Sequence, residues 1–272
     1  MDRGGRAAFH RDERFSPART RTEEVDMPVA FVTGAAQGIG RATARRLASD
    51  GMHVVCADQQ DASGTVAEIE GEGGKAEAVE LDVRSASQWS DAVSGVLDRH
   101  GRIDHLANIA GVVNMVSSDT VVGLTEEGWD YVVDTDLKGP WLGMRAVIPG
   151  MIDAGGGRIV NISSLAALRG LPNLASYSAA KGGVAALTRQ VAYEYGQDGI
   201  LVNAIAPGTI DTPILGDITP EMKQANAAAH IVDRLGRPEE IASMVSYLMR
   251  EGSFLTGVVY PVDGGWVAKG NF

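Results

Sequence analysis

The sequence predicts an α/β fold in which about seven parallel strands form one doubly wound sheet with helices on both faces. Two observations predict this fold class. Short apolar runs alternate with helical patterns from Pro28 onward, and several of these runs are apolar without interruption. Strands buried on both faces show this uninterrupted pattern. In addition, a glycine-rich turn joins the first apolar run to the first helical stretch.

The elements follow from residue type and period along the chain. The expected strands are Val29–Thr33, His53–Ala57, Ala76–Leu81, Ile103–Ala107, Arg158–Ser163, Leu201–Ala206 and Val258–Pro261. The expected helices span residues 38–50, 62–71, 86–99, 126–152, 175–197 and 238–250. Gly139 and Pro140 interrupt the longest of these patterns, which predicts a kink there rather than two separate elements.

The chain divides into a short tail and one domain. Residues 1–26 alternate arginines with acidic residues and contain few large apolar side chains, so we expect a disordered tail. Residues 27–272 contain no linker and no repeat, and their length suits one catalytic domain. Within it, residues 209–237 are expected to form a lid over the substrate.

Composition excludes several classes of partner. The formal net charge is −11, which disfavours nucleic acid and anionic membranes as partners. No apolar run is long enough to cross a bilayer. Cys56 is the one cysteine, so no intrachain disulfide can form, which fits a cytoplasmic location. The five histidines show no metal-ligand spacing, and we predict no metal site.

The glycine-rich turn has the chemistry of a dinucleotide site. The segment Thr33–Gly40 lies between the first strand and the first helix. Glycines let the backbone approach a pyrophosphate, and the helix N-terminus offers N–H groups and a favourable dipole. Three residues separate Gly34 from Gly38, so the spacing differs from G-x-G-x-x-G. Its place in a βαβ pattern nevertheless predicts a Rossmann-type nucleotide-binding fold.

Asp58 predicts which dinucleotide binds. It ends the second strand, where a carboxylate accepts hydrogen bonds from ribose hydroxyls and repels a 2′-phosphate. Gln37 and Gln59 occupy positions where a basic residue would favour NADP, so NAD is the expected cofactor. Arg41 is the nearest opposing charge, and we expect it to point to solvent. The alternative role for Asp58 is that of a helix N-cap.

Two further strands end in polar residues at the edge where open α/β sheets bind ligands. Asp82 and Val83 follow the third strand, and Asp82 is a candidate partner for the adenine amino group. Asn108 and Gly111 follow the fourth strand. They either line the cofactor or brace the central sheet, because a buried Asn often only satisfies backbone groups.

Tyr177 and Lys181 form a candidate acid/base pair. Residues four apart share one helix face. An ammonium about 4 Å from a phenol at an effective dielectric near 20 is worth about 4 kcal/mol. That would lower the Tyr177 pKa, ordinarily about 10, by up to about 3, although desolvation opposes the effect. By itself the spacing is also typical of a surface Tyr and a solvated Lys.

Taken in order, these motifs resemble the single-domain branch of the short-chain dehydrogenase/reductase family. The resemblance covers Pro28 to about Trp266. The residues that carry it are the Thr33–Gly40 turn, Asp82, Asn108–Gly111, Ser164, Tyr177, Lys181, Pro207–Gly208 and Val262–Gly265. The resemblance implies an NAD-dependent oxidoreductase that interconverts a secondary alcohol and a ketone by hydride transfer.

The resemblance also implies residue roles. Tyr177 would be the general acid/base, Ser164 would orient the substrate oxygen, and Lys181 would bind the nicotinamide ribose and depress the Tyr177 pKa. The cofactor would contact Gly34, Gln37, Gly38, Ile39, Gly40, Asp58, Gln59, Asp82, Val83, Asn108, Ala110, Gly111, Ile162, Tyr177, Lys181, Pro207, Gly208, Ile210 and Thr212. The Tyr-x-x-x-Lys spacing disfavours an enoyl reductase.

The chain departs from the family pattern at two positions. Ile109 replaces an Asn at the end of the fourth strand, which is a tolerable change. Asp136 stands where the family carries an Asn that supports a proton relay to the lysine, and we count Asp136 among the catalytic candidates. It keeps acceptor capacity but loses the amide donor. We expect Asp136 to pair with Lys181 through water; the alternative is that it merely braces the kink before Pro140.

Substrate and assembly remain broad expectations. Apolar lid residues with Val112, Val113, Met115, Leu165 and Leu171 suggest an apolar pocket for a small-molecule alcohol or ketone. A 3-oxoacyl thioester, a sugar or polyol, and a cyclic alcohol all remain possible substrates. A protein that binds the dinucleotide without turnover is the competing class. The resemblance further implies a homotetramer, which would suit an exposed Trp266 and Phe272.

Overall fold

A computed structural model describes residues 27–114 and 116–269 of the chain. The expected tail 1–26, Met115 and Phe272 therefore lie outside the described residues. The sheet consists of β1 (Val29–Thr33), β2 (His53–Asp58), β3 (Lys75–Glu80), β4 (His105–Asn108), β5 (Gly157–Ile162), β6 (Ile200–Pro207) and β7 (Val259–Val262). Its strands are all parallel and lie in the order β3-β2-β1-β4-β5-β6-β7, which confirms the predicted fold class.

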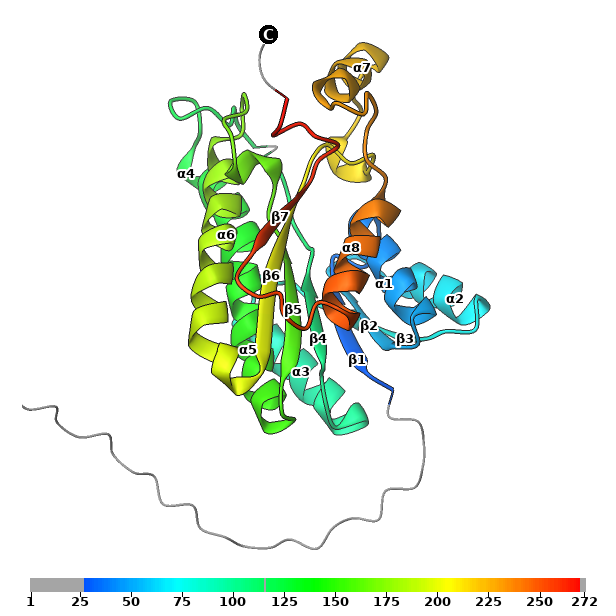
Figure 1. Cartoon of the computed structure of the whole chain (residues 1–272). Helices are drawn as coiled ribbons and strands as arrows, with labels where there is room; N and C mark the ends of the chain where they lie inside the picture. The colour runs from blue at the N-terminus through cyan, green and yellow to red at the C-terminus, as the bar shows by residue number, and fades with distance from the viewer. Residues whose placement is uncertain (1–26, 115, 270–272) are drawn as a thin grey trace, which may run out of the picture.

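Eight α-helices connect the strands in the described part of the chain. They are α1 (Gly38–Ser49), α2 (Ser63–Gly71), α3 (Ala86–His100), α4 (Glu126–Val133), α5 (Gly139–Asp153), α6 (Ala175–Tyr195), α7 (Pro220–Ala229) and α8 (Pro238–Arg250). Figure 1 shows α4, α5 and α6 on one face of the sheet and α1 and α8 on the other. None of these helices combines the length and the hydropathy that a membrane-spanning segment requires.

Each face of the sheet has its own apolar core. Phe31 and Trp89 pack ring against ring at 5.4 Å on the face covered by α3 and α5. Ala30, Val32 and Ile241 belong to the core under α1 and α8. Successive residues of β1 therefore point to opposite faces, and all of them are buried. This double burial explains the uninterrupted apolar runs of the sequence.

The fourth strand begins later than predicted. Asp104 precedes the regular ladder: its carboxylate accepts a hydrogen bond from the backbone N–H of Val29 at 2.8 Å, and its own N–H donates to the Val29 carbonyl at 2.9 Å. Its side chain is also ion-paired with Arg102. Regular pairing with β1 therefore starts at His105 rather than at Ile103.

The predicted kink is a π-helical turn. Asp134–Lys138 form this turn between α4 and α5, and Pro140 occupies the first turn of α5. A π-turn inserts an extra residue into the helix and often marks a functional site. Here it displaces Asp136 toward the interior, where the side chain is fully buried.

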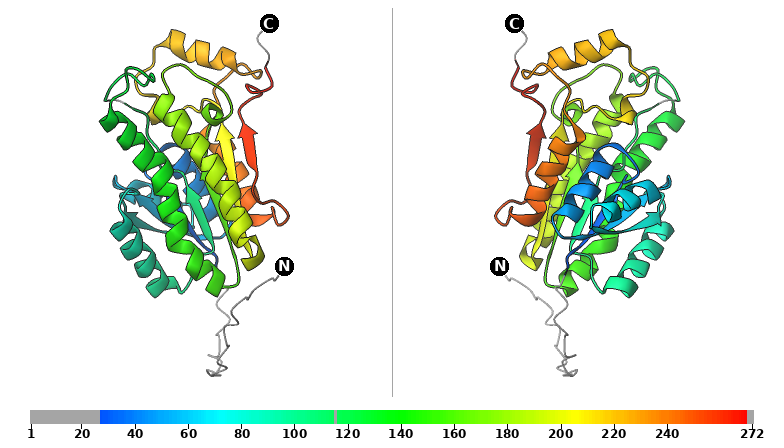
Figure 2. Two further views of the ribbon diagram at one scale, coloured as in Figure 1. Left: turned by 90° about the vertical axis from the view of Figure 1, so that its left-hand side faces the viewer. Right: turned by 90° about the vertical axis from the view of Figure 1, so that its right-hand side faces the viewer.

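The carboxyl ends of the strands meet at one edge of the molecule. Figure 2 shows β6 and β7 pointing toward α7, which lies beyond that edge. The connections after β1, β2, β4, β5 and β6 therefore gather near one another, as sheets of this type require for a ligand site.

Candidate active site

The turn after β1 can exist only with glycine at two of its positions. Gly34 has a φ of +69°, in the left-handed region that disfavours other residues. A Cβ on Gly40 would lie 1.9 Å from the carbonyl oxygen of Gly34. The first turn of α1 thus packs directly on the loop, which leaves the N-terminus of the helix open to a ligand.

The Asp58 carboxylate is held in a fixed orientation at the end of β2. One oxygen accepts a hydrogen bond from the backbone N–H of Ala36 at 3.0 Å, and the other accepts one from Gln60 at 2.9 Å. Asp58 does not cap α2, since the N-cap position is Ala62. The carboxylate therefore joins the glycine-rich loop to β2 and retains lone pairs for a further donor.

Arg41 is directed away from this carboxylate. Its guanidinium is ion-paired with Glu68 on α2, with a second hydrogen bond of 3.0 Å from Nε to Oε2. Arg41, the basic residue nearest to Asp58 in the predicted site, is thus paired with Glu68 at the exposed surface of the helices.

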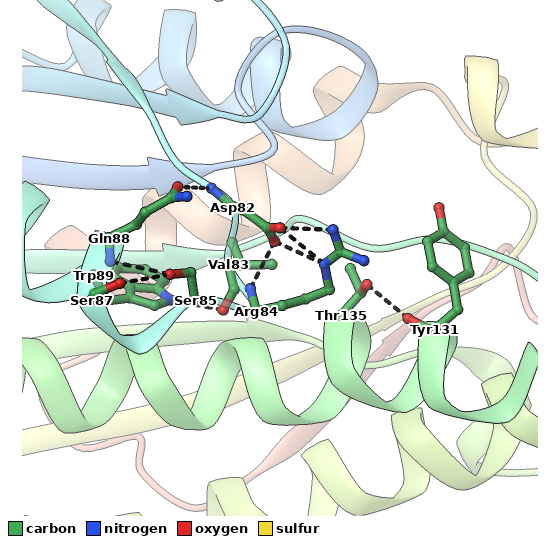
Figure 3. Close-up of polar contacts among 9 residues, drawn as sticks. All are labelled: Asp82, Val83, Arg84, Ser85, Ser87, Gln88, Trp89, Tyr131 and Thr135. Carbon is green, nitrogen blue, oxygen red and sulfur yellow. Dashed lines mark hydrogen bonds and ion pairs between the residues drawn. The ribbon is translucent and has the colours of Figure 1, made fainter. Parts of the chain in front are cut away.

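A cation that the sequence analysis missed lies beside Asp82, the candidate partner for the adenine amino group. Arg84 donates to both oxygens of Asp82, and the shortest contact joins Nη2 to Oδ2 at 2.7 Å. Its guanidinium also lies 6.0 Å from the centre of the Tyr131 ring (Figure 3). The hydrogen bond from Arg84 lowers the pKa of Asp82, so this carboxylate is ionised. Asp82 would therefore meet an adenine amino group as part of an Asp82–Arg84 pair.

These elements line a cavity of about 480 Å³. Thr212 forms part of its wall opposite Gly38, whose added Cβ would lie 3.3 Å from the Thr212 methyl group. The predicted cofactor residues that line the cavity are Gly34, Gln37, Gly38, Ile39, Gly40, Asp58, Gln59, Asp82, Val83, Ala110, Gly111 and Thr212. Its volume and its position at the strand ends suit a bound nucleotide.

Asn108 has the structural role that the sequence analysis left open. It is buried, and its amide donates to the side-chain oxygen of Asn161 at 2.8 Å and to the carbonyl of Pro140 at 3.4 Å. It thus ties β4 to β5 and to the start of α5. Asn108 does not line the cavity.

Lys181 is fixed by two oxygen atoms in the interior. Its ammonium lies 3.0 Å from Asp136 Oδ2 and donates to the carbonyl of Ile162 at 3.0 Å. Both charged side chains are almost fully buried. The ion pair is direct, so the expected water between these two residues is wrong. Asp136 also accepts a hydrogen bond from the N–H of Val112 at 2.8 Å, which attaches the pair to the loop after β4.

Burial and charge act against each other within this pair. Burial lowers the pKa of Lys181, but Asp136 and Tyr177 together outweigh this effect, so the lysine pKa lies above its usual value. Burial also raises the pKa of Asp136, an effect that Lys181 opposes. Such a pair is strongly interdependent, because removing either partner leaves an uncompensated buried charge.

Tyr177 lies between Ser164 and Lys181. The Ser164 side chain lies near enough to lower the pKa of the Tyr177 phenol, and the Lys181 ammonium lies 5.5 Å from the centre of the Tyr177 ring. Burial raises the pKa of Tyr177 and outweighs the lowering by Lys181, while Asp136 raises it further. The expected depression of the tyrosine pKa is therefore wrong for this structure. The physical reasons are that desolvation is stronger than the effect of Lys181 and that the Asp136 charge adds to it.

The start of α6 depends on another residue that the sequence analysis missed. The buried carboxylate of Asp119 accepts hydrogen bonds from the Ser176 backbone N–H at 2.8 Å and from its hydroxyl at 2.9 Å. These contacts join the loop after β4 to the first turn of the helix, one residue before Tyr177.

Three predicted cofactor residues, Pro207, Gly208 and Ile210, do not line the large cavity. Gly208 and Ile210 line a smaller cavity of about 130 Å³ together with His230. His230 is buried and accepts a hydrogen bond from the N–H of Thr209 at 3.1 Å. Pro207 ends β6 immediately before this segment. Trp266 was expected to be exposed, but it is partly buried, because its ring packs edge-on against His230 at 4.9 Å.

Known proteins are similar to this chain over most of its length. A family model described as enoyl-(acyl carrier protein) reductase matches residues 34–267. The short-chain reductase protein NovJ of Streptomyces niveus is 41% identical over 263 residues, covering 92% of this chain and 98% of that protein. Cyclohexanol dehydrogenase of an Acinetobacter species is 38% identical over 245 residues, covering 89% of this chain and 95% of that protein.

A solved structure shows the same fold with a cofactor. A variant of actinorhodin polyketide ketoreductase with NADPH has a TM-score of 0.84 and 33% identity, covering 90% of this chain and 98% of that chain. The fold and the site thus define an oxidoreductase that binds a nicotinamide dinucleotide. The chain belongs to the short-chain dehydrogenase/reductase family. Exchange between an alcohol and a ketone, as the sequence predicts, agrees with these relatives.

Proposed function

We propose that this protein is an NAD-dependent dehydrogenase that interconverts an apolar secondary alcohol and its ketone. The observation that carries the proposal is the grouping of Ser164 and Tyr177 with the buried Lys181–Asp136 ion pair. A phenol thus lies close to both a hydroxyl and a buried ammonium. Such an arrangement can move one proton at the substrate oxygen.

Each residue has a separate task in this mechanism. When bound, the nicotinamide ring supplies hydride chemistry at the carbinol carbon. The Ser164 hydroxyl orients the substrate oxygen, and Tyr177 takes up its proton in oxidation or returns one in reduction. The positive charge of Lys181 stabilises the tyrosinate. Because burial raises the pKa of Tyr177, the phenol retains its proton near neutral pH. Reduction is therefore favoured at neutral pH, and oxidation accelerates as the pH rises.

The preference for NAD rests on charge at the adenosine end. Asp58 is held by two backbone N–H groups, and Gln37 and Gln59 line the same cavity. A 2′-phosphate at this place would face a carboxylate. The two nearby arginines, Arg41 and Arg84, are engaged by Glu68 and Asp82. These contacts support NAD over NADP.

The lid favours a small apolar substrate. Ile214 and Leu215 from the lid and Val112 and Val113 from the opposite loop line the large cavity. Leu165 is instead buried in the interior. The relative named for cyclohexanol oxidation makes a cyclic secondary alcohol the first candidate.

A 3-oxoacyl thioester is the second candidate, because a structural relative is named as a polyketide ketoreductase. The charges of the lid disfavour a large anionic carrier. Lys223 pairs with Asp211 at 2.7 Å, Arg234 pairs with Glu240 at 2.7 Å, and Arg237 lies 3.7 Å from Glu240. Asp211 in the lid and Glu240 at the start of α8 neutralise these cations, so the cations offer little attraction to a carrier protein.

Homotetramer formation is part of the proposal. Trp141 on α5 and Tyr193 on α6 are exposed on one surface, while Phe254 after α8 is fully exposed on another. Large exposed aromatic side chains suit burial between subunits. Light scattering measures the mass in solution directly, and a monomer at micromolar concentration would refute this part.

The first test is turnover. The full chain is mixed with NAD or NADP and with cyclic alcohols, polyols, steroids and hydroxyacyl thioesters, and reduced cofactor is followed by absorbance. We expect the highest kcat/KM with NAD and a cyclic alcohol. Tyr177→Phe should lower kcat by about 10²–10⁴-fold, because the proton acceptor is lost. Cofactor binding without turnover on any substrate class would favour a non-catalytic dinucleotide-binding protein.

A further inference from the structure

Two histidines and a glutamate meet at the end of the sheet opposite the active site. His53 is the first residue of β2, Glu77 lies in β3, and His100 is the last residue of α3. In the parallel pair β2–β3, Val55 lies opposite Glu77, so His53 and Glu77 project from the same face. α3 covers that face through Trp89, Val93 and Val96. The three side chains therefore converge although they are distant in sequence.

Their geometry is that of a metal-ligand set. One ligand atom from each side chain lies within 4.8 Å of the other two. The imidazole rings of His53 and His100 are 4.2 Å apart between centres and inclined by 40°. Glu77 Oε1 lies 3.1 Å from His100 Nε2. Two imidazoles and one carboxylate are the ligands of several three-residue zinc sites.

One of these ligand atoms lacks a partner. Within the described residues, His53 Nε2 is buried and has no hydrogen-bond partner. An unpaired buried imidazole nitrogen is costly, and an ion or a water molecule is the usual reason for one. Its place beside a carboxylate and a second imidazole favours a cation with affinity for nitrogen.

We propose that His53, Glu77 and His100 bind a divalent transition-metal ion of the zinc type. Ligands around zinc lie about 3.5 Å from one another, so the three side chains need to close by about 1 Å. His100 and Glu77 can supply this movement, since both retain 22–24% exposure and His100 ends its helix. The ion would join the end of α3 to the β2–β3 edge of the sheet.

Arg99 competes for the same carboxylate. Its Nε and Nη2 donate to the two oxygens of Glu77 at 2.8 and 3.0 Å. A bound metal ion would share or displace this guanidinium, and the positive charge of Arg99 weakens its binding. The proposal therefore predicts that removing Arg99 leaves metal binding intact or strengthens it. A purely structural Arg99–Glu77–His100 cluster predicts no such gain.

The test is a zinc titration of the full chain, prepared without a histidine tag and treated with a chelator. Calorimetry should detect one bound zinc ion per chain. His100→Gln and Glu77→Gln should abolish this binding, whereas Arg99→Gln should bind zinc at least as tightly as the parent protein. His10→Gln is the matched control, because His10 is distant in sequence from all three ligands and lies outside the described residues. It should bind zinc like the parent.

Two further measurements keep the test decisive. Circular dichroism and dehydrogenase turnover verify that each variant is folded, since none of the substituted residues belongs to the active site. Zinc should raise the thermal midpoint of the parent protein and of Arg99→Gln, but not that of His100→Gln. The proposal is overturned if the parent shows no saturable zinc binding, or if His100→Gln and Glu77→Gln bind zinc as the parent does.

Discussion

The Asp136 carboxylate governs the active site at the scale of single residues. It lies 3.0 Å from Lys181 and is fully buried, so it replaces a neutral amide expected from the family by a charge. The carboxylate raises the pKa of Lys181 and contributes to the raised pKa of Tyr177. This chain thus holds its lysine firmly protonated and its tyrosine protonated to higher pH. The Asp136 carboxylate therefore favours the protonated form of both Lys181 and Tyr177.

Replacing Asp136 by Asn should shift the pH dependence of the reaction. Tyr177 is the base in oxidation, so the rate rises as the pH passes through the tyrosine pKa. Since the Asp136 charge raises that pKa, Asp136→Asn should move the rising limb of the oxidation profile to lower pH. The profile of kcat against pH measures this directly. An identical profile in the variant would contradict a role for Asp136 in proton exchange.

Packing between α6 and the π-helical turn positions the same residues at the scale of elements. The turn brings Asp136 to the face of α6 that carries Lys181, and Leu137 beside it contacts Gly183. A Cβ on Gly183 would lie 2.8 Å from a Leu137 methyl carbon, whereas one on Gly182 would meet nothing within 4 Å. Of these two adjacent glycines, Gly183 has no room for a side chain, whereas Gly182 has room for one among the described residues.

These glycines offer a matched pair of variants. Gly183→Ala should lower the free energy of unfolding by about 1–3 kcal/mol, because it overpacks the contact with Leu137. It should also lower kcat by displacing Asp136 from Lys181. Gly182→Ala should be neutral or stabilising by up to about 1 kcal/mol, since alanine favours a helix. Urea unfolding and turnover measure both effects, and equal behaviour of the two variants would contradict the packing model.

At the scale of the whole molecule, a buried histidine in the central strand β4 makes the stability of the fold depend on pH. His105 is buried in β4 between β1 and β5, and within the described residues its Nδ1 has no hydrogen-bond partner. Burial lowers the pKa of His105 from 6.5 to about 4. The unfolded chain therefore binds this proton at higher pH than the folded protein does, and stability falls as the pH falls.

Acid should destabilise the protein between pH 6.5 and about 4, the interval between the two His105 pKa values. The loss from this residue should reach about 3 kcal/mol, at 1.36 kcal/mol for each pKa unit. In His105→Leu, unfolding free energies measured across this interval should depend less on pH. A variant with the same acid dependence as the parent would show that other groups are responsible.

Local sequence determined much of this protein by itself. Neighbouring residues set the hydrophobic period and the local backbone geometry. These local properties are what identify the uninterrupted apolar runs, the Thr33–Gly40 turn and the Tyr177–Lys181 spacing. The sheet, its helices except α7 and many residues of the large cavity were predictable for this reason. Ser164 was predicted only through the motifs that resemble the family, because no periodic pattern distinguishes it from other serines.

Only the tertiary structure determined which charged residues, distant in sequence, lie next to one another in space. The direct Asp136–Lys181 pair depends on a π-turn, and the Tyr177 pKa depends on a balance of burial and charge that spacing does not reveal. The contacts of Arg84 with Tyr131 and of Asp119 with Ser176 also exist only because the fold brings these residues together. The same holds for His53, Glu77 and His100, whose convergence requires the register of β2 with β3 and the docking of α3. Electrostatics depends on distance and burial in space, so sequence separation alone cannot predict it.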